Sequence, residues 1–195
     1  MAYCLYEFAK HPEIQLKVQQ EIDRVLKSAK SEGVTYEMLN DLKYLECCID
    51  EALRKYPIVP ILFRQCVEDY KMPDSDVTIL KGQVVFIPVL GLQRDPEIFE
   101  NPLEYKPERF QNSSHGGNEN AKGLFYLPFG DGPRNCIGMR LGKLTAKLGL
   151  VTVLSKYSVD FADKTMADKE LDFDPRQFVL MPTQKFNFKV TERKL

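Results

Sequence analysis

The sequence predicts a mainly α-helical fold with small β-sheets, an α+β arrangement. Three segments, which begin near residues 12, 42 and 137, repeat apolar residues at helical spacing. Short β-branched or apolar runs, separated by turn residues, lie between the second and third of these segments and again near the carboxyl terminus. With 195 residues, of which 44% are hydrophobic, the chain is long enough to bury one sizeable core.

The first predicted helix covers about residues 12–29. It begins at Pro12, a residue that is tolerated at the first helical position. Its apolar positions, which recur at helical spacing, are Ile14, Val18, Ile22 and Val25. Gly33 ends the pattern, and Thr35 then predicts the N-cap of a short helical turn that finishes near Asn40.

The second long helix is expected over about residues 42–56, which carry a clear apolar stripe. The stripe consists of Leu42, Leu45, Ile49, Leu53 and Tyr56. Pro57 and Pro60 follow directly and prevent the helix from continuing.

A small sheet of hairpins is expected after this helix. Between residues 61 and 86, short apolar runs are broken by turn residues, and residues 77–80 and 83–87 are the best candidate strands. Residues 95–125 are rich in Pro, Asn, Gly and Ser. Because such a stretch is too long for an ordinary connection in a compact domain, it indicates a functional or disordered loop.

A last long helix follows that loop. Its expected apolar stripe consists of Ile137, Leu141, Leu144, Leu148 and Val151. Arg140, Lys143 and Lys147 share another face, about 90° from the stripe at 100° per residue. Further on, residues 178–181 and 185–190 are expected to pair as a hairpin.

Charge and cysteine usage argue against several classes of protein. The 27 Lys and Arg residues balance the 28 Asp and Glu residues, so nucleic-acid binding is not expected as the main task. The five cysteines are odd in number and lack paired spacings, which favours a reducing compartment over a secreted disulfide framework. No apolar run approaches the roughly 20 residues that cross a bilayer, so we expect no membrane anchor in this chain.

Cys136 is the main candidate for chemistry, because it stands just before the start of the last helix. Unpaired backbone N–H groups and the positive end of the helix dipole favour a thiolate there, the form that ligates metals. Arg134 adds a nearby positive charge. Gly130, Gly132 and Gly138 let the backbone bend sharply and approach a flat ligand closely.

Three other interpretations compete for Cys136: a buried structural cysteine, a nucleophile and a phosphate-binding loop. A buried cysteine is the common situation for an isolated residue of this type. A nucleophile needs a nearby base, and the sequence offers only His11 and His115, neither of which stands where a base is expected. A G-x-G-x-x-G phosphate loop needs a glycine where Asn135 stands.

The cysteine loop resembles the haem-binding signature of the cytochrome P450 family. The matching positions are Phe129, Gly132, Arg134, Cys136 and Gly138. The resemblance implies that Cys136 is the axial thiolate of the haem b iron, that Arg134 pairs with a haem propionate and that Phe129 packs beside the thiolate. The cofactor-binding set that it implies is Cys136, Arg134, Phe129, Gly130, Gly138 and Arg64, the last being the second arginine expected at a propionate.

Glu51 and Arg54 stand three residues apart on the second long helix and face the same side. A solvated surface pair is one interpretation, whereas Cys47, one turn earlier on that face, favours a buried one. The family carries such a pair together with a later arginine, here Arg109 of the segment 107–110. The resemblance therefore implies a buried network of Glu51, Arg54 and Arg109 that supports the cysteine loop and takes no part in chemistry.

The resemblance also implies a pocket for a lipophilic small molecule. Its expected lining residues are Val59, Pro60, Ile61, Leu62, Pro182 and Thr183. Apolar residues at these positions are also what ordinary core packing selects.

Electrons are expected from an NADPH-dependent flavin reductase, which would use the basic face of the last helix for docking. Arg140, Lys143 and Lys147 are the expected docking residues, and a solvated helical face is the alternative interpretation.

By resemblance, residues 1–195 form a partial cytochrome P450 domain, from the end of the central helix to the carboxyl-terminal hairpin. The expected activity of the parent protein is insertion of one atom of O2 into a lipophilic substrate, with reduction of the other atom to water. The oxygen-activating threonine and the membrane anchor are absent from this chain, and the parent is expected on the cytosolic face of the endoplasmic reticulum. The pattern looks most like animal microsomal members, including insect detoxification enzymes.

The isolated chain is expected to retain haem weakly and to show no turnover. Two alternatives to the monooxygenase remain open at this point. One is a non-catalytic truncated remnant that binds a partner, and the other is a haem-thiolate isomerase or lyase that needs no reductase.

Overall fold

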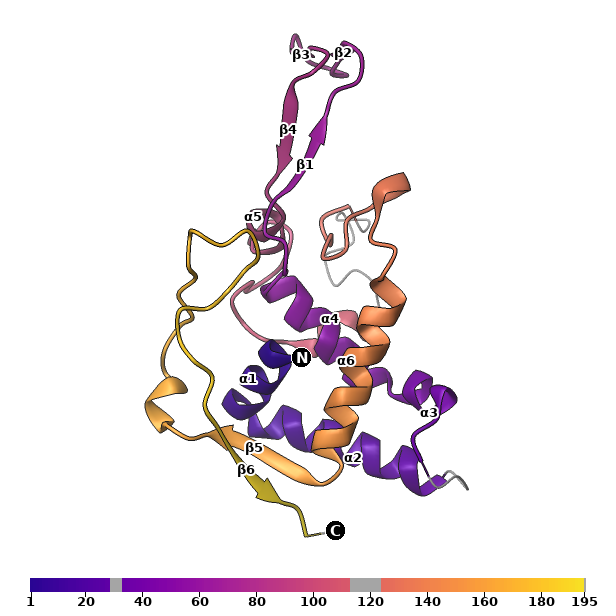
Figure 1. The fold of residues 1–195 in the computed structure, drawn as a ribbon, viewed down its shortest axis with the longest axis vertical. Coiled ribbons are helices and arrows are strands. Elements are labelled where there is room, and N and C mark those ends of the chain that lie inside the picture. Colours follow the sequence, from indigo (N-terminus) through magenta and orange to yellow (C-terminus); the bar gives the residue numbers. More distant parts are fainter. Residues whose placement is uncertain (29–32, 113–123, 195) are drawn as a thin grey trace.

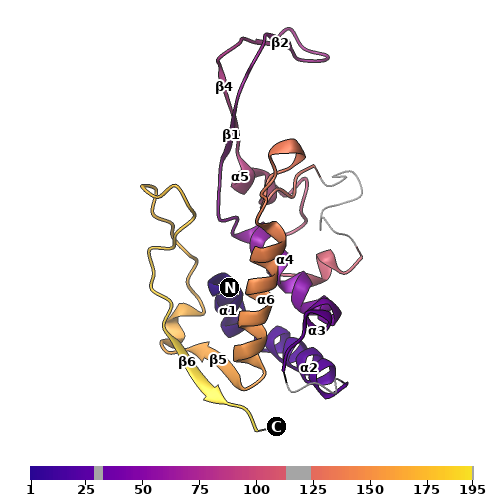
Figure 2. The same cartoon turned by 45° about the vertical axis from the view of Figure 1, so that its right-hand side comes forward.

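The computed structural model describes residues 1–28, 33–112 and 124–194. A ribbon built of two antiparallel strand pairs projects from one end of a body of helices, and a third antiparallel pair lies along its flank (Figures 1 and 2). Across these described ranges, no helix combines the length and the apolar character that a membrane crossing requires. The predicted end of the first long helix at residue 29 and the part of the irregular loop that contains His115 lie outside the described residues.

The helices confirm the predicted α+β class together with the strands described below. They are α1 (Ala2–Lys10), α2 (Pro12–Ser28), α3 (Tyr36–Asp41), α4 (Lys43–Lys55), α5 (Val89–Gln93) and α6 (Met139–Leu154), with short 3-10 helices η1 (Pro107–Phe110), η3 (Gly132–Arg134) and η4 (Lys164–Met166). The short helix α3 begins as predicted, because the Thr35 hydroxyl accepts the N–H of Met38 at 3.4 Å.

The hydrophobic core lies where α1, α2, α4 and α6 meet (Figure 2). Val18 and Ile22 of α2, Leu45 of α4, and Leu150 and Leu154 of α6 are completely buried. Burying a side chain of this kind stabilises the fold by roughly 1.5–3 kcal/mol. The apolar stripes predicted on α2 and α4 therefore do face the core and hold these helices together.

The projecting ribbon confirms the predicted hairpins, with narrower strand limits. Strand β1 (Leu62–Gln65) pairs antiparallel with β4 (Val84–Ile87), and β2 (Tyr70–Lys71) pairs with β3 (Thr78–Ile79) farther out. The ribbon leaves the body directly after α4, as Figure 1 shows. Its base is therefore fixed close to the end of that helix.

The predicted hairpin between residues 178–181 and 185–190 is wrong. Strand β6 (Phe188–Glu192) pairs instead with β5 (Tyr157–Phe161), which follows α6. In this register Phe188 lies opposite Phe161, and Val159 and Phe161 are buried against the body. Burial of these residues selects the distant partner over the local one, which the sequence pattern alone does not reveal.

The predicted apolar stripe of the last helix is right at Val151, which is buried, and at Leu144, which packs against the core, but wrong at its other three positions. Ile137 precedes the helix and is fully exposed, and Leu141 and Leu148 are 67% and 44% exposed. Besides Val151, the buried face of α6 carries Leu150 and Leu154 together with a lysine. The apolar pattern did not distinguish the face that meets α4 and α2 from the face that remains open in this chain.

Candidate functional site

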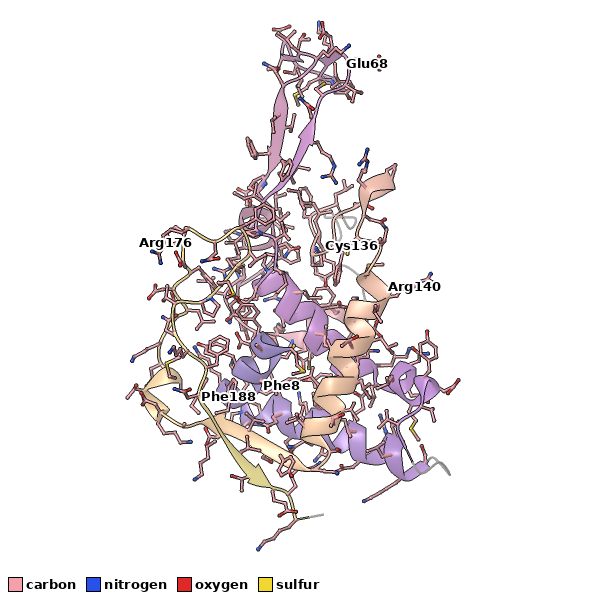
Figure 3. All side chains as sticks on the ribbon, in the orientation of Figure 1. Phe8, Glu68, Cys136, Arg140, Arg176 and Phe188 are labelled. Carbon is pink, nitrogen blue, oxygen red and sulfur yellow. The ribbon has the colours of Figure 1, made fainter. Side chains whose placement is uncertain are left out.

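The cysteine loop, residues 129–138, contains η3, leads into α6 and presents Cys136 at the surface (Figure 3). The backbone N–H of Cys136 donates to the carbonyl of Phe129 at 2.8 Å, which closes the loop on itself. Gly130 and Gly132 have φ angles of +72° and +70°, in the left-handed region that side chains with a Cβ rarely adopt. Gly138 is the N-cap of α6, and a Cβ there would lie 3.8 Å from the Cys136 sulfur.

An open groove of about 670 Å³ lies between β1 and the cysteine loop. Its lining residues are Val59, Ile61, Leu62, Phe63, Arg64, Gln65, Val67, Arg134 and Phe178. The loop approaches β1 closely at this point, because a Cβ on Gly130 would lie 3.8 Å from Cδ1 of Leu62. The groove thus brings together both predicted propionate-binding arginines and three of the predicted substrate-lining residues.

The residues around this groove fit the predicted haem. A flat, mainly apolar group with two carboxylates needs apolar walls and two cationic donors, and Arg64 and Arg134 supply planar guanidinium groups suited to carboxylates. The thiol of Cys136 is accessible, as an axial sulfur ligand must be. At the bends with positive φ angles, Gly130 and Gly132 leave the loop backbone without side chains.

The remaining predicted lining residues lie elsewhere. Pro182 forms an isolated β-bridge with Phe173, and the N–H of Thr183 donates to the carbonyl of Asp172 at 2.9 Å. Neither residue lines the groove; Phe178 of the same carboxyl-terminal segment does. Pro60 does not line it either, and its carbonyl accepts the N–H of Leu90 at 3.0 Å.

Glu51, Arg54 and Arg109 form one buried ion network. The two oxygens of Glu51 accept Nε and Nη2 of Arg54 at 2.8 and 2.9 Å, and Oε1 also accepts Nε of Arg109 at 3.2 Å. Glu51 and Arg54 are completely buried, so the solvated surface pair is excluded. Arg54 further donates to the carbonyls of Gln93, Pro102 and Glu104, which ties α4 to the segment that leads to η1.

Gln93 is completely buried and has a role that was not predicted from the sequence. Its side-chain N–H groups donate to the carbonyls of Leu53 and Arg54 at 3.1 and 2.8 Å. Its side-chain oxygen accepts the N–H of Leu127, which leads into the cysteine loop, at 2.8 Å. These partners lie about 34 to 40 positions away along the chain, so no local pattern in the sequence indicates them.

The proposed docking face is contradicted at two of its three residues. Lys147 is buried, where its ammonium group contacts the carbonyl of Leu39 at 3.0 Å and Glu46 at 3.2 Å. Lys143 is half-buried and pairs with Asp50 of α4. These contacts turn both lysines inward toward α3 and α4. Arg140 alone of the three is exposed, and Figure 3 shows it projecting outward from the start of α6.

Comparison with known proteins gives matches along nearly the whole chain. A family model described as cytochrome P450 matches residues 1–190. The chain is 42% identical over 175 residues to "Cytochrome P450 6d3" of Musca domestica, which covers 88% of this chain and 32% of that protein. It is 40% identical over 194 residues to "Cytochrome P450 6B2" of Helicoverpa armigera, covering 100% of this chain and 37% of the relative. A third relative, "Cytochrome P450 6a8" of Drosophila melanogaster, is 40% identical over 92% of this chain and 35% of its own length. The chain therefore spans about a third of the length of the curated relatives that it matches.

Proposed function

Because this chain belongs to the cytochrome P450 family, we propose that it forms the haem-thiolate part of a monooxygenase. The proposed reaction inserts one atom of O2 into a lipophilic small molecule and reduces the other atom to water. The observation that supports this proposal most directly is the groove in which Arg64 and Arg134 meet apolar walls beside the loop of Cys136.

Cys136 and five of the residues that line the groove have proposed tasks. Cys136 would hold haem b as its thiolate ligand, and the bound haem would supply the chemistry of oxygen activation. Arg64 and Arg134 bind its carboxylates and so fix the orientation of the ring. Val59, Ile61 and Phe178 exclude water from the groove and favour a lipophilic substrate over a polar one.

The electron supply and the location of the parent protein are part of the same proposal. Electrons come from NADPH through a flavin-containing reductase, and the parent works at the cytosolic face of the endoplasmic reticulum membrane. Of the residues first expected to dock the reductase, Arg140 remains a candidate because it is exposed close to the cysteine loop. Lys143 and Lys147 are no longer candidates for docking, because Asp50 and Glu46 neutralise their charges within the body.

The direct test adds haemin to the purified chain, reduces it under carbon monoxide and records the Soret band. We expect the red-shifted band of a thiolate ligand in the wild-type chain and its absence in Cys136→Ala. Cys66→Ala is the matched control, because Cys66 is another partly accessible cysteine and is not among the residues that line the groove. A red-shifted band that survives in Cys136→Ala would overturn the assignment of the ligand.

A second candidate function rests on the apolar residues that the ribbon leaves bare. Phe63 and Phe86 are opposite each other in the register of β1 and β4 and are 56% and 67% exposed, and Val67 is 80% exposed. Exposed apolar surface of this kind favours a non-catalytic role in binding a partner. The partner-binding role is favoured if the haemin test gives identical, featureless spectra for the wild-type chain and Cys136→Ala.

A further inference from the structure

Asp50 on α4 holds two residues that flank the cysteine loop. Its Oδ1 accepts the hydroxyl of Tyr126 at 3.0 Å and contacts the ammonium group of Lys143 at 2.6 Å. The Tyr126 hydroxyl also lies 3.2 Å from the backbone carbonyl of Asp50. Tyr126 precedes Cys136 in the chain and Lys143 follows it, so a single carboxylate joins the entrance of the loop to its exit.

The surroundings of Asp50 make these contacts persistent. Its side chain is 10% exposed and that of Lys143 is 24% exposed, so solvent screens the pair only weakly. Tyr126 is also fixed from the other side, because its ring packs against Phe110 with centroids 4.9 Å apart. Tyr126 is therefore held by packing as well as by its polar bonds.

The two neighbouring carboxylates of α4 serve different segments. Glu51 binds Arg54 and Arg109 and accepts the N–H of Lys106, all of which lie before the cysteine loop in the chain. Asp50 binds Tyr126 and Lys143, one on each side of Cys136. The Glu51 network thus makes no contact with the segment that follows the cysteine loop, whereas Asp50 contacts that segment through Lys143.

We infer that Asp50 is a positioning residue for Cys136, which fixes the sulfur by tying both ends of its loop to α4. This inference rests on the proposed haem-thiolate function for its consequence, but the geometry of the tie stands independently of any ligand. Asp50 itself lies outside the groove, so it acts through the loop backbone rather than by touching the cofactor.

Stability alone does not account for a carboxylate at this place. Burial raises the pKa of Asp50, and the nearby Lys143 and Tyr126 only partly offset this effect. The charged form therefore carries a desolvation penalty at neutral pH, as is general for buried ion pairs. Asp50 brings this penalty and also links both flanks of the cysteine loop. Its role in positioning the loop accounts for a carboxylate here.

The first test measures hydrogen exchange of the loop amides in the chain without haem. We expect Asp50→Asn to accelerate exchange of residues 127–142 by about threefold to tenfold relative to wild type, because the loop loses part of its anchorage. Glu46→Gln is the matched control: Glu46 also lies on α4 and pairs with a lysine of α6, Lys147, but contacts neither flank of the loop. It should leave loop exchange unchanged.

The second test uses the haemin-loaded chain and the ferrous carbon monoxide spectrum. Asp50→Asn should lower the fraction of the red-shifted thiolate band, whereas Glu46→Gln should leave that fraction at the wild-type value. Tyr126→Phe keeps the ring packing and removes one hydroxyl, so it should change both measurements in the same direction by a smaller factor. It also serves as the test if Asp50→Asn fails to fold.

The outcomes separate the two proposals. Loop exchange in Asp50→Asn that equals wild type, or that Glu46→Gln matches, would overturn the positioning role. If the wild-type chain shows no thiolate band, the proposed haem-thiolate function is contradicted. The hydrogen-exchange data, measured without haem, would still test whether Asp50 anchors the loop. Faster loop exchange with an unchanged thiolate fraction would show that the tie does not determine the position of the sulfur, and this too counts against the inference.

Discussion

The side-chain oxygen of Gln93 accepts the backbone N–H of Leu127 at 2.8 Å. Gln93 ends α5 and is completely buried, while Leu127 precedes the cysteine loop. The same amide donates to two carbonyls at the end of α4, those of Leu53 and Arg54. One glutamine therefore connects α4, α5 and the start of the loop through three hydrogen bonds.

Replacing Gln93 by alanine should destabilise the chain by about 3 kcal/mol, because it leaves buried carbonyl and N–H groups without their partners. The free energy of unfolding in urea measures this loss. Gln65→Ala is the control, since Gln65 is exposed and makes one bond, to the carbonyl of Gly82. Equal stability of Gln93→Ala and Gln65→Ala would contradict the proposed importance of the buried amide.

The Glu51 network should respond unequally to loss of its two arginines. Arg54 is completely buried and bonds to Glu51 through two nitrogens, whereas Arg109 contributes one bond to that carboxylate. Lysine cannot reproduce the planar fork, so Arg54→Lys should lose roughly 3–5 kcal/mol of unfolding free energy. We expect about 1 kcal/mol for Arg109→Lys. Urea titration of both variants measures these losses of unfolding free energy. Equal losses would show that Arg54 is not the principal partner of Glu51.

Local signals in the sequence were sufficient for α2, α3 and α4. Apolar spacing located the long helices, and the cap at Thr35 located the short one, because these features depend on residues close together in the chain. The loop of Cys136 was found by its glycine and arginine pattern for the same reason. Its glycines do adopt the unusual backbone angles that such a loop needs.

Features that depend on distant segments were missed. The buried lysine at position 147 occupies the inner face of α6 because Glu46 and the carbonyl of Leu39 receive its charge there. Nothing near Lys147 in the chain indicates those partners. Strand β6 likewise pairs with β5 rather than with its neighbour in the chain, and Gln93 has its role only because α4 and Leu127 lie beside it.

The inward position of Lys147 gives a direct prediction. Lys147→Glu places a second carboxylate beside Glu46, at a position whose side chain is only 7% exposed, so it should cost roughly 3 kcal/mol of stability. Arg140→Glu changes an exposed charge and should stay within about 0.5 kcal/mol of wild type. Thermal unfolding of the two variants checks this. A stable Lys147→Glu chain would restore Lys147 as a residue available to a reductase.

Glu7 of α1 forms a second buried charge cluster, away from the cysteine loop. Its Oε1 accepts the ammonium group of Lys55 at 2.8 Å and the hydroxyl of Tyr56 at 2.5 Å, and His11 lies 3.4 Å from Oε2. Burial alone would raise the pKa of Glu7, but the nearby His11 and the hydrogen bonds from Lys55 and Tyr56 outweigh it and hold the pKa below the ordinary value of 4.5.

This depressed pKa predicts how stability depends on pH. An acid whose pKa is lower in the folded than in the unfolded chain contributes its full stability above the unfolded value, and that contribution is lost as pH falls through the folded value. The wild-type chain should therefore lose stability as pH falls below 4.5. Glu7→Gln should be less stable by roughly 3 kcal/mol at neutral pH, because Lys55 loses its buried partner, and its stability should fall less steeply in acid.

Thermal unfolding of both chains across this pH range is the measurement, and Glu13→Gln is the control. Glu13 also lies 3.4 Å from His11, but its side chain is 66% exposed, so its removal should change neither the neutral stability nor the acid slope appreciably. If Glu7→Gln kept the wild-type acid slope, the slope would have to come from other carboxylates, and the buried cluster would not be the group that acid disrupts.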